Sequence, residues 1–216
     1  MMRYCKLMGE QYLFFCRHGY RDDLTDNSYQ FNPGLTTLGI AQSKLLAKEL
    51  KKYSISKIIA SPYIRTLETA KIISEKLGKC YAIDCCIGEW LNVEWMSQMP
   101  KLYTQNEISE RYPMARFDKP LVNIDYLYPE NIQQFKMRCL KTAEAINALS
   151  DSVLFVTHGR VLSEICANLT HTNENNFQTD ICCLTILKRN DSNEIWEIVL
   201  NGSIEHITKY IKIFQR

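Results

Sequence analysis

Short apolar runs that alternate with helix-spaced segments are the feature that most constrains this chain. Three runs, QYLFFC at 11–16, KIIA at 57–60 and VLFVT at 153–157, have the length and the β-branched or aromatic content of buried strands. Between the first two, apolar residues recur at helical spacing from Leu38 to Leu50. This alternation predicts a three-layer α/β/α sandwich, in which helices cover both faces of a mostly parallel sheet.

Caps, breakers and spacing predict the remaining elements. Thr36 or Thr37 is expected to cap the first helix, while Ser61 and Pro62 are expected as the N-cap and first turn of a second helix that ends near Leu77. We expect a third strand at 81–87 and two final strands at 181–187 and 195–200. Two more helices are expected at 129–149 and 161–169.

Residues 90–130 show no clean period and contain four prolines. The segment is too long for an ordinary connection, so we expect a cap inserted into a single domain that spans residues 1–216. The aromatic side chains of this segment could stack on a phenyl ring of a substrate, but we favour the interpretation that they form the core of the cap. These residues are Trp90, Trp95, Tyr103, Tyr112 and Phe117.

Charge and cysteine content exclude several classes of protein. The 26 Lys and Arg against 24 Asp and Glu leave a net charge of +2, which gives no reason to expect nucleic acid or an anionic membrane as a partner. No apolar run approaches the roughly 18 residues of a membrane span, and the N-terminal apolar stretch is too short for a signal peptide. The nine cysteines are odd in number and include no C-x-x-C, so we expect a cytoplasmic protein without a zinc site.

Polar residues follow several of the predicted strands directly. Arg17 and His18 follow the first strand, Glu89 follows the third, and His158 follows VLFVT. Arg65 lies near the start of the helix after KIIA. Ligands of open α/β sheets bind beyond the carboxyl ends of the strands, so we expect these side chains to converge at one edge of the sheet.

This set of residue types suits a phosphate monoester. The ester is a dianion, and Arg17, Arg21 and Arg65 carry planar guanidinium groups that match its oxygens and stay charged at any working pH. A neutral His18 has a lone pair that can attack phosphorus and form a phosphohistidine.

The other two residues complete a candidate phosphoryl-transfer site. His158 can donate a hydrogen bond to an equatorial oxygen, and Glu89 can protonate the leaving group. Taken singly, each residue has an ordinary structural explanation, and Glu94 is a nearby alternative to Glu89. Their expected convergence favours the catalytic interpretation.

The ordered motifs resemble those of the histidine phosphatase superfamily, which has the phosphoglycerate-mutase-like fold. The resemblance is carried by Arg-His-Gly at 17–19, by Ser-Pro-x-x-Arg at 61–65 with Thr69 and Ala70, and by His-Gly at 158–159. It implies that His18 accepts the phosphoryl group and that Arg17, Arg65 and His158 bind phosphate. No metal and no organic cofactor is expected.

Two details indicate which members of this superfamily the chain resembles most. Tyr20 stands where many members have Glu or Gln, and the central motif of the cofactor-dependent mutases is not found, which argues against mutase activity. The phosphatase domains of the STS/TULA group, regulators of receptor signalling, are similar in having an arginine at the position of Arg21. They also have a Glu-Trp pair at the position of Glu89 and Trp90.

Several alternatives remain to be weighed against a phosphatase that works through His18. A cysteine-dependent tyrosine phosphatase needs Cys-x5-Arg, but only four residues separate Cys16 from Arg21, so that class is excluded. A phosphoglycerate mutase, a sugar bisphosphatase of the same fold and a catalytically weak interaction module are the other hypotheses. The expected substrate is a phosphorylated small molecule or a phosphotyrosyl protein, and a homodimer is left open.

Overall fold

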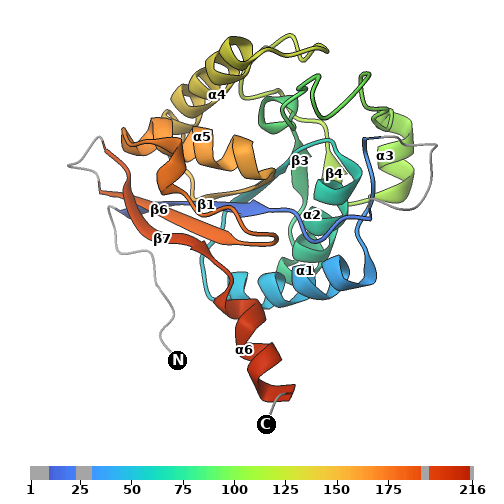
Figure 1. The fold of residues 1–216 in the computed structure, drawn as a ribbon. Coiled ribbons are helices and arrows are strands. Elements are labelled where there is room, and N and C mark those ends of the chain that lie inside the picture. The colour runs from blue at the N-terminus through green and yellow to red at the C-terminus, as the bar shows by residue number, and fades with distance from the viewer. Residues whose placement is uncertain (1–9, 23–30, 191–194, 215–216) are drawn as a thin grey trace.

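The computed structural model describes residues 10–22, 31–190 and 195–214, and its centre is a seven-stranded sheet (Figure 1). The strand order is β4-β3-β2-β5-β1-β6-β7. The strands are β1 (Glu10–Arg17), β2 (Lys57–Ala60), β3 (Tyr81–Ile83), β4 (Ala115–Arg116), β5 (Val153–Thr157), β6 (Leu184–Asn190) and β7 (Glu197–Ser203).

The register of the parallel strands brings their carboxyl ends together. β1 pairs in parallel with β5, with Arg17 opposite Thr157, and β5 pairs in parallel with β2, with Val156 opposite Ala60. β3 and β4 continue the parallel part of the sheet, whereas β6 and β7 are antiparallel. The predicted mostly parallel sheet is therefore confirmed, with an antiparallel extension beyond β1.

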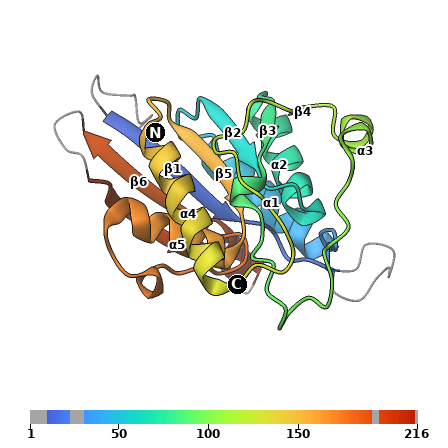
Figure 2. The ribbon, with the colours of Figure 1, turned by 90° about the horizontal axis from the view of Figure 1, so that it is seen from above.

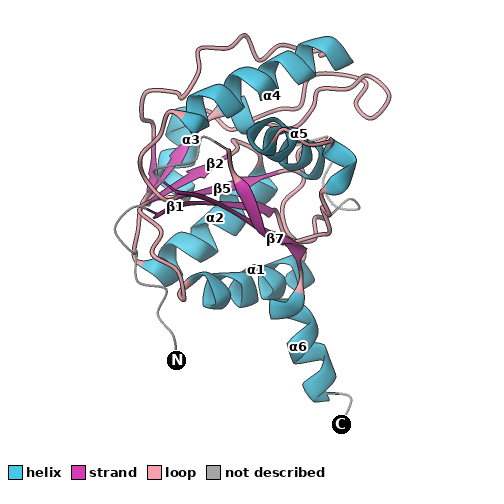
Figure 3. Ribbon diagram, turned by 90° about the vertical axis from the view of Figure 1, so that its left-hand side faces the viewer, coloured by secondary structure: helices cyan, strands magenta, loops and turns pink. Residues whose placement is uncertain are grey.

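Helices cover both faces of the sheet, as Figures 1 and 3 show. One face carries α1 and α2, and the other carries α4 and α5; Figure 2, seen from above, shows α4 and α5 lying over the strands while α3 lies to one side. The helices are α1 (Thr37–Leu50), α2 (Ile64–Leu77), α3 (Gln105–Arg111), α4 (Ile132–Asn147), α5 (Gly159–Thr170) and α6 (Glu205–Phe214). This is the expected three-layer α/β/α sandwich.

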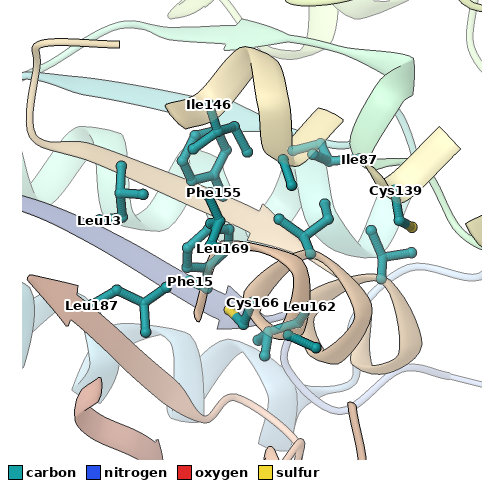
Figure 4. Close-up of a cluster of buried hydrophobic side chains, with 14 of the residues drawn as sticks. Leu13, Phe15, Ile87, Cys139, Ile146, Phe155, Leu162, Cys166, Leu169 and Leu187 are labelled. Atoms are coloured by element: carbon teal, nitrogen blue, oxygen red, sulfur yellow. The ribbon is translucent and has the colours of Figure 1, made fainter. Parts of the chain in front are cut away.

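Side chains of β1 alternate between two buried clusters because successive residues of a strand face opposite sides. Leu13 and Phe15 belong to the cluster under α4 and α5, where Phe15 stacks on Phe155 at 4.9 Å between ring centroids (Figure 4). Phe14 and Cys16 belong to the cluster under α1 and α2. A strand that is apolar on both faces is thus explained by burial on both faces.

The predicted cap of the first helix was confirmed, whereas the predicted start of the second helix was wrong. α1 is capped by Thr36, whose hydroxyl accepts from the Gly39 backbone N–H at 3.0 Å. α2, however, begins at Ile64 after the N-cap Tyr63, so Ser61 and Pro62 do not open it. The Ser61 hydroxyl instead lies 2.8 Å from Nε2 of His158, on a neighbouring strand end.

Other elements also differ from the prediction, among them α4, which begins at Ile132 and not at 129. β3 ends at Ile83, because the Asp84 side chain accepts from the Cys86 backbone N–H and starts a short 3-10 turn at Cys85–Ile87. β6 begins at Leu184, because Cys182 has a positive φ of 58° that a strand does not tolerate. The sequence reading also missed α6 at the end of the chain.

The segment 90–130 contains little regular structure, as expected. It holds α3, with a capping box between Thr104 and Glu107, and the two-residue strand β4, which extends the sheet beside β3. Its aromatic residues divide into two groups: Tyr112 is buried, whereas Trp95 and Phe117 are 50% and 39% exposed. In the described part of the chain, no helix has the length and apolar character needed to cross a bilayer.

Candidate active site

His18 lies immediately beyond β1, and its backbone is held on both sides. Its N–H donates to the Thr157 carbonyl at 3.1 Å, and its carbonyl accepts from the Cys182 N–H at 3.1 Å. Nδ1 lies 2.8 Å from the Gly19 carbonyl, which can only accept, so we assign the ring proton to Nδ1. Nε2 is left with its lone pair toward Arg65, whose Nε donates to it at 3.2 Å.

The imidazole of His18 is neutral at physiological pH. Burial lowers its pKa well below the usual value, and the positive charge of Arg65 lowers it further. The side chain is 1% exposed. The structure therefore presents a neutral, oriented imidazole, with Nε2 unprotonated, at the carboxyl end of the central strand.

Gly19 and Thr69 connect two of the sequence motifs. A Cβ atom at Gly19 would lie 2.5 Å from the Gly39 carbonyl oxygen, so no larger residue fits between β1 and α1. The Gly19 N–H donates to the Thr69 hydroxyl at 3.1 Å, and that hydroxyl donates to the Arg65 carbonyl at 2.8 Å. These contacts fix His18 relative to the first turn of α2.

Arg65 is the centre of the site and is fully buried. Besides the contact with His18, its Nη2 donates to Oε2 of Glu89 at 3.1 Å and lies 3.2 Å from Nδ1 of His158. The guanidinium lies over the Tyr63 ring at 4.6 Å from the centroid. One guanidinium thus touches both histidines and the carboxylate. The sequence predicted Arg65 as a phosphate-binding residue but gave no indication of these contacts.

His158 is the N-cap residue of α5 and is fully buried. Its Nδ1 lies 3.2 Å from Oε2 of Glu89, an acceptor, and its Nε2 lies 2.8 Å from the Ser61 hydroxyl. We assign the proton to Nδ1, so Ser61 donates to Nε2. Burial lowers the pKa of His158 to about 4, against the opposing effect of Glu89, so this ring is also neutral at physiological pH.

Glu89 follows the 3-10 turn after β3, and its side chain is 13% exposed. Burial opposes ionisation, but His158 and Arg65 outweigh it and hold the pKa of this carboxyl well below its usual range. Because His158 is itself neutral above about pH 4, Arg65 supplies the charge that keeps Glu89 ionised. The carboxylate must therefore take up a proton before it can donate one.

Arg17 ends β1 and donates through Nη1 to the Thr179 carbonyl at 2.7 Å. Its Nε and the Nη1 of Arg65 are the two buried guanidinium nitrogens without a hydrogen-bond partner in the described part of the protein. An unpaired buried donor is costly, and such donors in native structures call for an acceptor. Two of them beside the His18 nucleophile suit the oxygens of a phosphoryl group.

The two remaining candidates lie further out. Arg21 forms an isolated β-bridge with Leu35, and its charge contributes to lowering the pKa values of Arg17 and Arg65, after the larger effect of burial. Glu94 is exposed, and its N–H donates to the Asn92 side chain in a local turn. The structure thus brings Arg17, His18, Arg65, Glu89 and His158 together, with Arg21 close enough for its charge to act on them.

Sequence reasoning missed three residues that contact this cluster. Ser61, which binds His158, was interpreted as a helix cap, although the Ser-Pro-x-x-Arg motif could have marked it. Tyr63 lies edge-on to His158 at 5.0 Å between ring centroids. Tyr126 donates to the Glu89 carbonyl at 2.6 Å, and no sequence signal pointed to it.

A cavity of about 560 Å³ lies between the segment 90–130 and the carboxyl ends of β2 and β3. Pro62 and Asp84 border it on the sheet side, and Tyr103, Phe117 and Asn123 are among the residues on the cap side. Within the residues that the structure describes, no three His, Cys, Asp or Glu side chains gather in the manner of metal ligands.

The chain is similar in sequence to a protein of known domain composition. Over 146 residues the chain is 30% identical to human "Ubiquitin-associated and SH3 domain-containing protein A", an alignment that covers 62% of this chain and 22% of that protein. The chain therefore spans about a fifth of the length of this relative.

Two solved structures share the fold. Ecdysone phosphate phosphatase from Bombix mori, in complex with tungstate, matches with a TM-score of 0.70 at 20% identity, over 89% of this chain and 93% of that one. Phosphoserine phosphatase from Entamoeba histolytica, in complex with 3-phosphoglyceric acid, matches with a TM-score of 0.63 at 18% identity, over 91% and 99%. Residues 13–201 match the family described as histidine phosphatase superfamily (branch 1). The match runs from β1 to β7 and includes all the motifs that converge on His18, so this chain belongs to the histidine phosphatase superfamily.

Proposed function

We propose that the protein is a phosphatase that hydrolyses phosphate monoesters through a phosphohistidine on Nε2 of His18. The observation that carries the proposal is the neutral His18 ring next to two buried guanidinium N–H groups without partners. Such a site attracts a dianion and offers it a nucleophile, and hydrogen bonds from Arg17 and Arg65 stabilise the transferring phosphoryl group. His158 joins them when Glu89 is protonated, because its Nδ1–H can then turn from Glu89 to a phosphoryl oxygen.

In the first step, Nε2 of His18 attacks phosphorus, and the bond between phosphorus and the ester oxygen breaks. The leaving oxygen takes a proton from Glu89. Glu89 acquires that proton when the substrate binds, because a dianion next to the carboxylate raises its pKa and competes for Arg65. The Nδ1–H of His18, bonded to the Gly19 carbonyl, stabilises the positive charge that the ring gains.

In the second step, water attacks the phosphohistidine and gives a proton to Glu89. The bond between nitrogen and phosphorus breaks, phosphate leaves, and His18 returns to its neutral form. All proton transfers are assigned to residues of this chain, and no metal ion is part of the mechanism. A chelator should therefore leave turnover unchanged.

The segment 90–130 is proposed as the cap that selects the substrate, since Tyr126 of this segment contacts Glu89 and the segment borders a cavity of about 560 Å³ at the carboxyl ends of β2 and β3. Phosphorylated small molecules and phosphotyrosyl proteins both remain candidates, and the phosphatases among the solved neighbours favour hydrolysis over the mutase alternative. A reducing, cytoplasmic setting is supported by eight described cysteines, all of which are free thiols.

The test of the mechanism is to trap the intermediate. Wild-type protein is mixed with a phosphate-labelled monoester, quenched in alkali and separated from free label. We expect protein-bound label that is stable in alkali and lost in acid, as a phosphoramidate bond requires, at up to one equivalent per chain. Label that survives acid, or none at all during turnover, would overturn the phosphohistidine mechanism.

A further inference from the structure

Tyr126 belongs to the cap, but its hydroxyl contacts residues 86–89, the backbone segment that carries Glu89 and is called the strap below. The hydroxyl donates to the Glu89 carbonyl at 2.6 Å. It also lies 3.0 Å from the Tyr63 hydroxyl. Because the single proton of Tyr126 is used for Glu89, Tyr63 is the donor in the second bond.

Tyr63 continues this chain of contacts into the phosphate site. Its side chain is fully buried, its ring lies edge-on to His158 at 5.0 Å, and the Arg65 guanidinium covers its face at 4.6 Å. Tyr126 is therefore linked to the backbone of Glu89 directly and to Arg65 and His158 through one intervening ring.

The strap itself leaves room for Tyr126. Gly88 has φ −67° and ψ 161°, a conformation open to any residue, so its backbone does not call for glycine. A Cβ atom at Gly88, however, would lie 2.7 Å from Cζ of Tyr126. The absence of a side chain at this position is explained by the approach of the Tyr126 ring.

A second residue holds the same strap from the core side. Arg138 donates through Nη1 to the Cys86 and Gly88 carbonyls, both at 3.0 Å, and forms a buried ion pair with Glu130. This anchor belongs to α4, and it also contacts the segment 90–130 through Glu130 and through the Tyr126 ring, whose centroid lies 5.2 Å from the Arg138 guanidinium. The bond from Tyr126 to the Glu89 carbonyl is shorter than the 3.4 Å contact from Arg138 to the same oxygen. Loss of the Tyr126 hydroxyl should thus shift Glu89 without unfolding the strap.

We propose that Tyr126 is a positioning residue, through which the cap sets the orientation of the Glu89 carboxylate for proton transfer. The proposal rests on the phosphatase function proposed above and on the role of Glu89 as acid. The cap then takes part in the protonation step, in addition to its proposed role in selecting the substrate.

The test compares Tyr126→Phe with a matched control, Tyr128→Phe. Tyr128 also lies in the cap and also donates to a backbone carbonyl, that of Met96, at 2.6 Å, but it has no contact with Glu89 or Tyr63 among those the structure describes. Turnover is measured on an alkyl phosphate and on para-nitrophenyl phosphate, whose leaving group departs without protonation. Vanadate affinity and the pH profile of kcat are measured on the same preparations.

We expect Tyr126→Phe to slow the alkyl phosphate about five- to tenfold, the range of one lost hydrogen bond, and to shift the acid limb of the pH profile. Para-nitrophenyl phosphate turnover and vanadate affinity should change less than about twofold. Tyr128→Phe should behave as wild type. In a Glu89→Gln background, Tyr126→Phe should add no further loss.

An equal loss on both substrates, a similar loss in Tyr128→Phe, or a full additional loss in the Glu89→Gln background would overturn the positioning role. These outcomes are distinct from failure of the proposed function. If wild-type protein forms no phosphoenzyme, the phosphatase mechanism fails first. If the phosphoenzyme forms and Tyr126→Phe leaves the ratio of the two rates unchanged, the inference about Tyr126 fails alone.

Discussion

The carboxyl edge of the sheet and the cap are built in different ways. At the sheet edge, His18, Arg65 and His158 are at most 1% exposed and are held by the ladder of β1, β5 and β2 and by the first turns of α2 and α5. In the cap, Trp95 is 50% exposed and Leu127 is 69% exposed. Groups that must act on every substrate lie on a rigid frame, and groups that distinguish substrates can lie on loops. Changes to His18 and to the phosphate-binding arginines at the edge should affect all substrates, whereas changes in the cap should affect only some.

The largest effect is expected at the nucleophile. His18→Ala should lower kcat by about 10³-fold or more on every substrate, because the covalent acceptor is lost. Steady-state rates on several monoesters and an unfolding curve would check this. The matched control is His171→Asn, since His171 is an exposed histidine with a positive φ of 52° that asparagine tolerates. Substantial turnover by folded His18→Ala would contradict the proposed mechanism.

Glu89 should show an effect that depends on the leaving group. Glu89→Gln should slow an alkyl phosphate by about 10²-fold, because an alkoxide needs a proton, and should cost para-nitrophenyl phosphate little. Both substrates are compared on one preparation, so that any unfolded fraction cancels in the ratio. An equal loss on both would mean that Glu89 only orients Arg65 or supports the strap.

The arginines should differ in their effect on anion affinity. Arg65→Ala and Arg17→Ala should each weaken vanadate binding by about 10- to 100-fold, since each removes a charge-assisted donor from the dianion. Arg21→Ala should cost only a few-fold, because Arg21 acts on the site through its charge at longer range. Competition of vanadate with substrate gives the affinities. A loss in Arg21→Ala that equals the loss in Arg65→Ala would move Arg21 into direct contact with phosphate.

The smallest effect, and the one that most sharpens the comparison, is expected in the cap. Phe117→Ala should leave vanadate affinity unchanged within about twofold, because the side chain borders a cavity that none of the three phosphate-binding arginines lines. It should alter the relative kcat/KM of substrates with bulky and small leaving groups by a few-fold. A uniform loss on all substrates would show that this part of the cap supports the sheet edge and does not select among them.

Much of the candidate catalytic cluster could be predicted because its residues lie at or just beyond the ends of strands. Arg17 ends β1, His18 and His158 directly follow β1 and β5, and parallel strands that pair in register bring these ends to one place. Arg65 could be predicted near the site, but its contacts with His18, Glu89 and His158 could not, because a side chain of that length can reach several partners. Ser61 was assigned a local role as a cap, and the bond it makes to a residue far away in the sequence took precedence.

The chain by itself determined the central strands β1, β2 and β5, the helices that flank them and the order of the motifs, since periodicity, caps and short apolar runs are local properties. Tertiary structure alone decided the protonation of His18 and Glu89, because a pKa depends on burial and on charges that arrive from other elements. It also decided that Tyr126 meets Glu89 across the space that Gly88 leaves open. A tyrosine in an irregular segment carries no period and no motif, so only the packing of the cap against the sheet edge could assign it a partner.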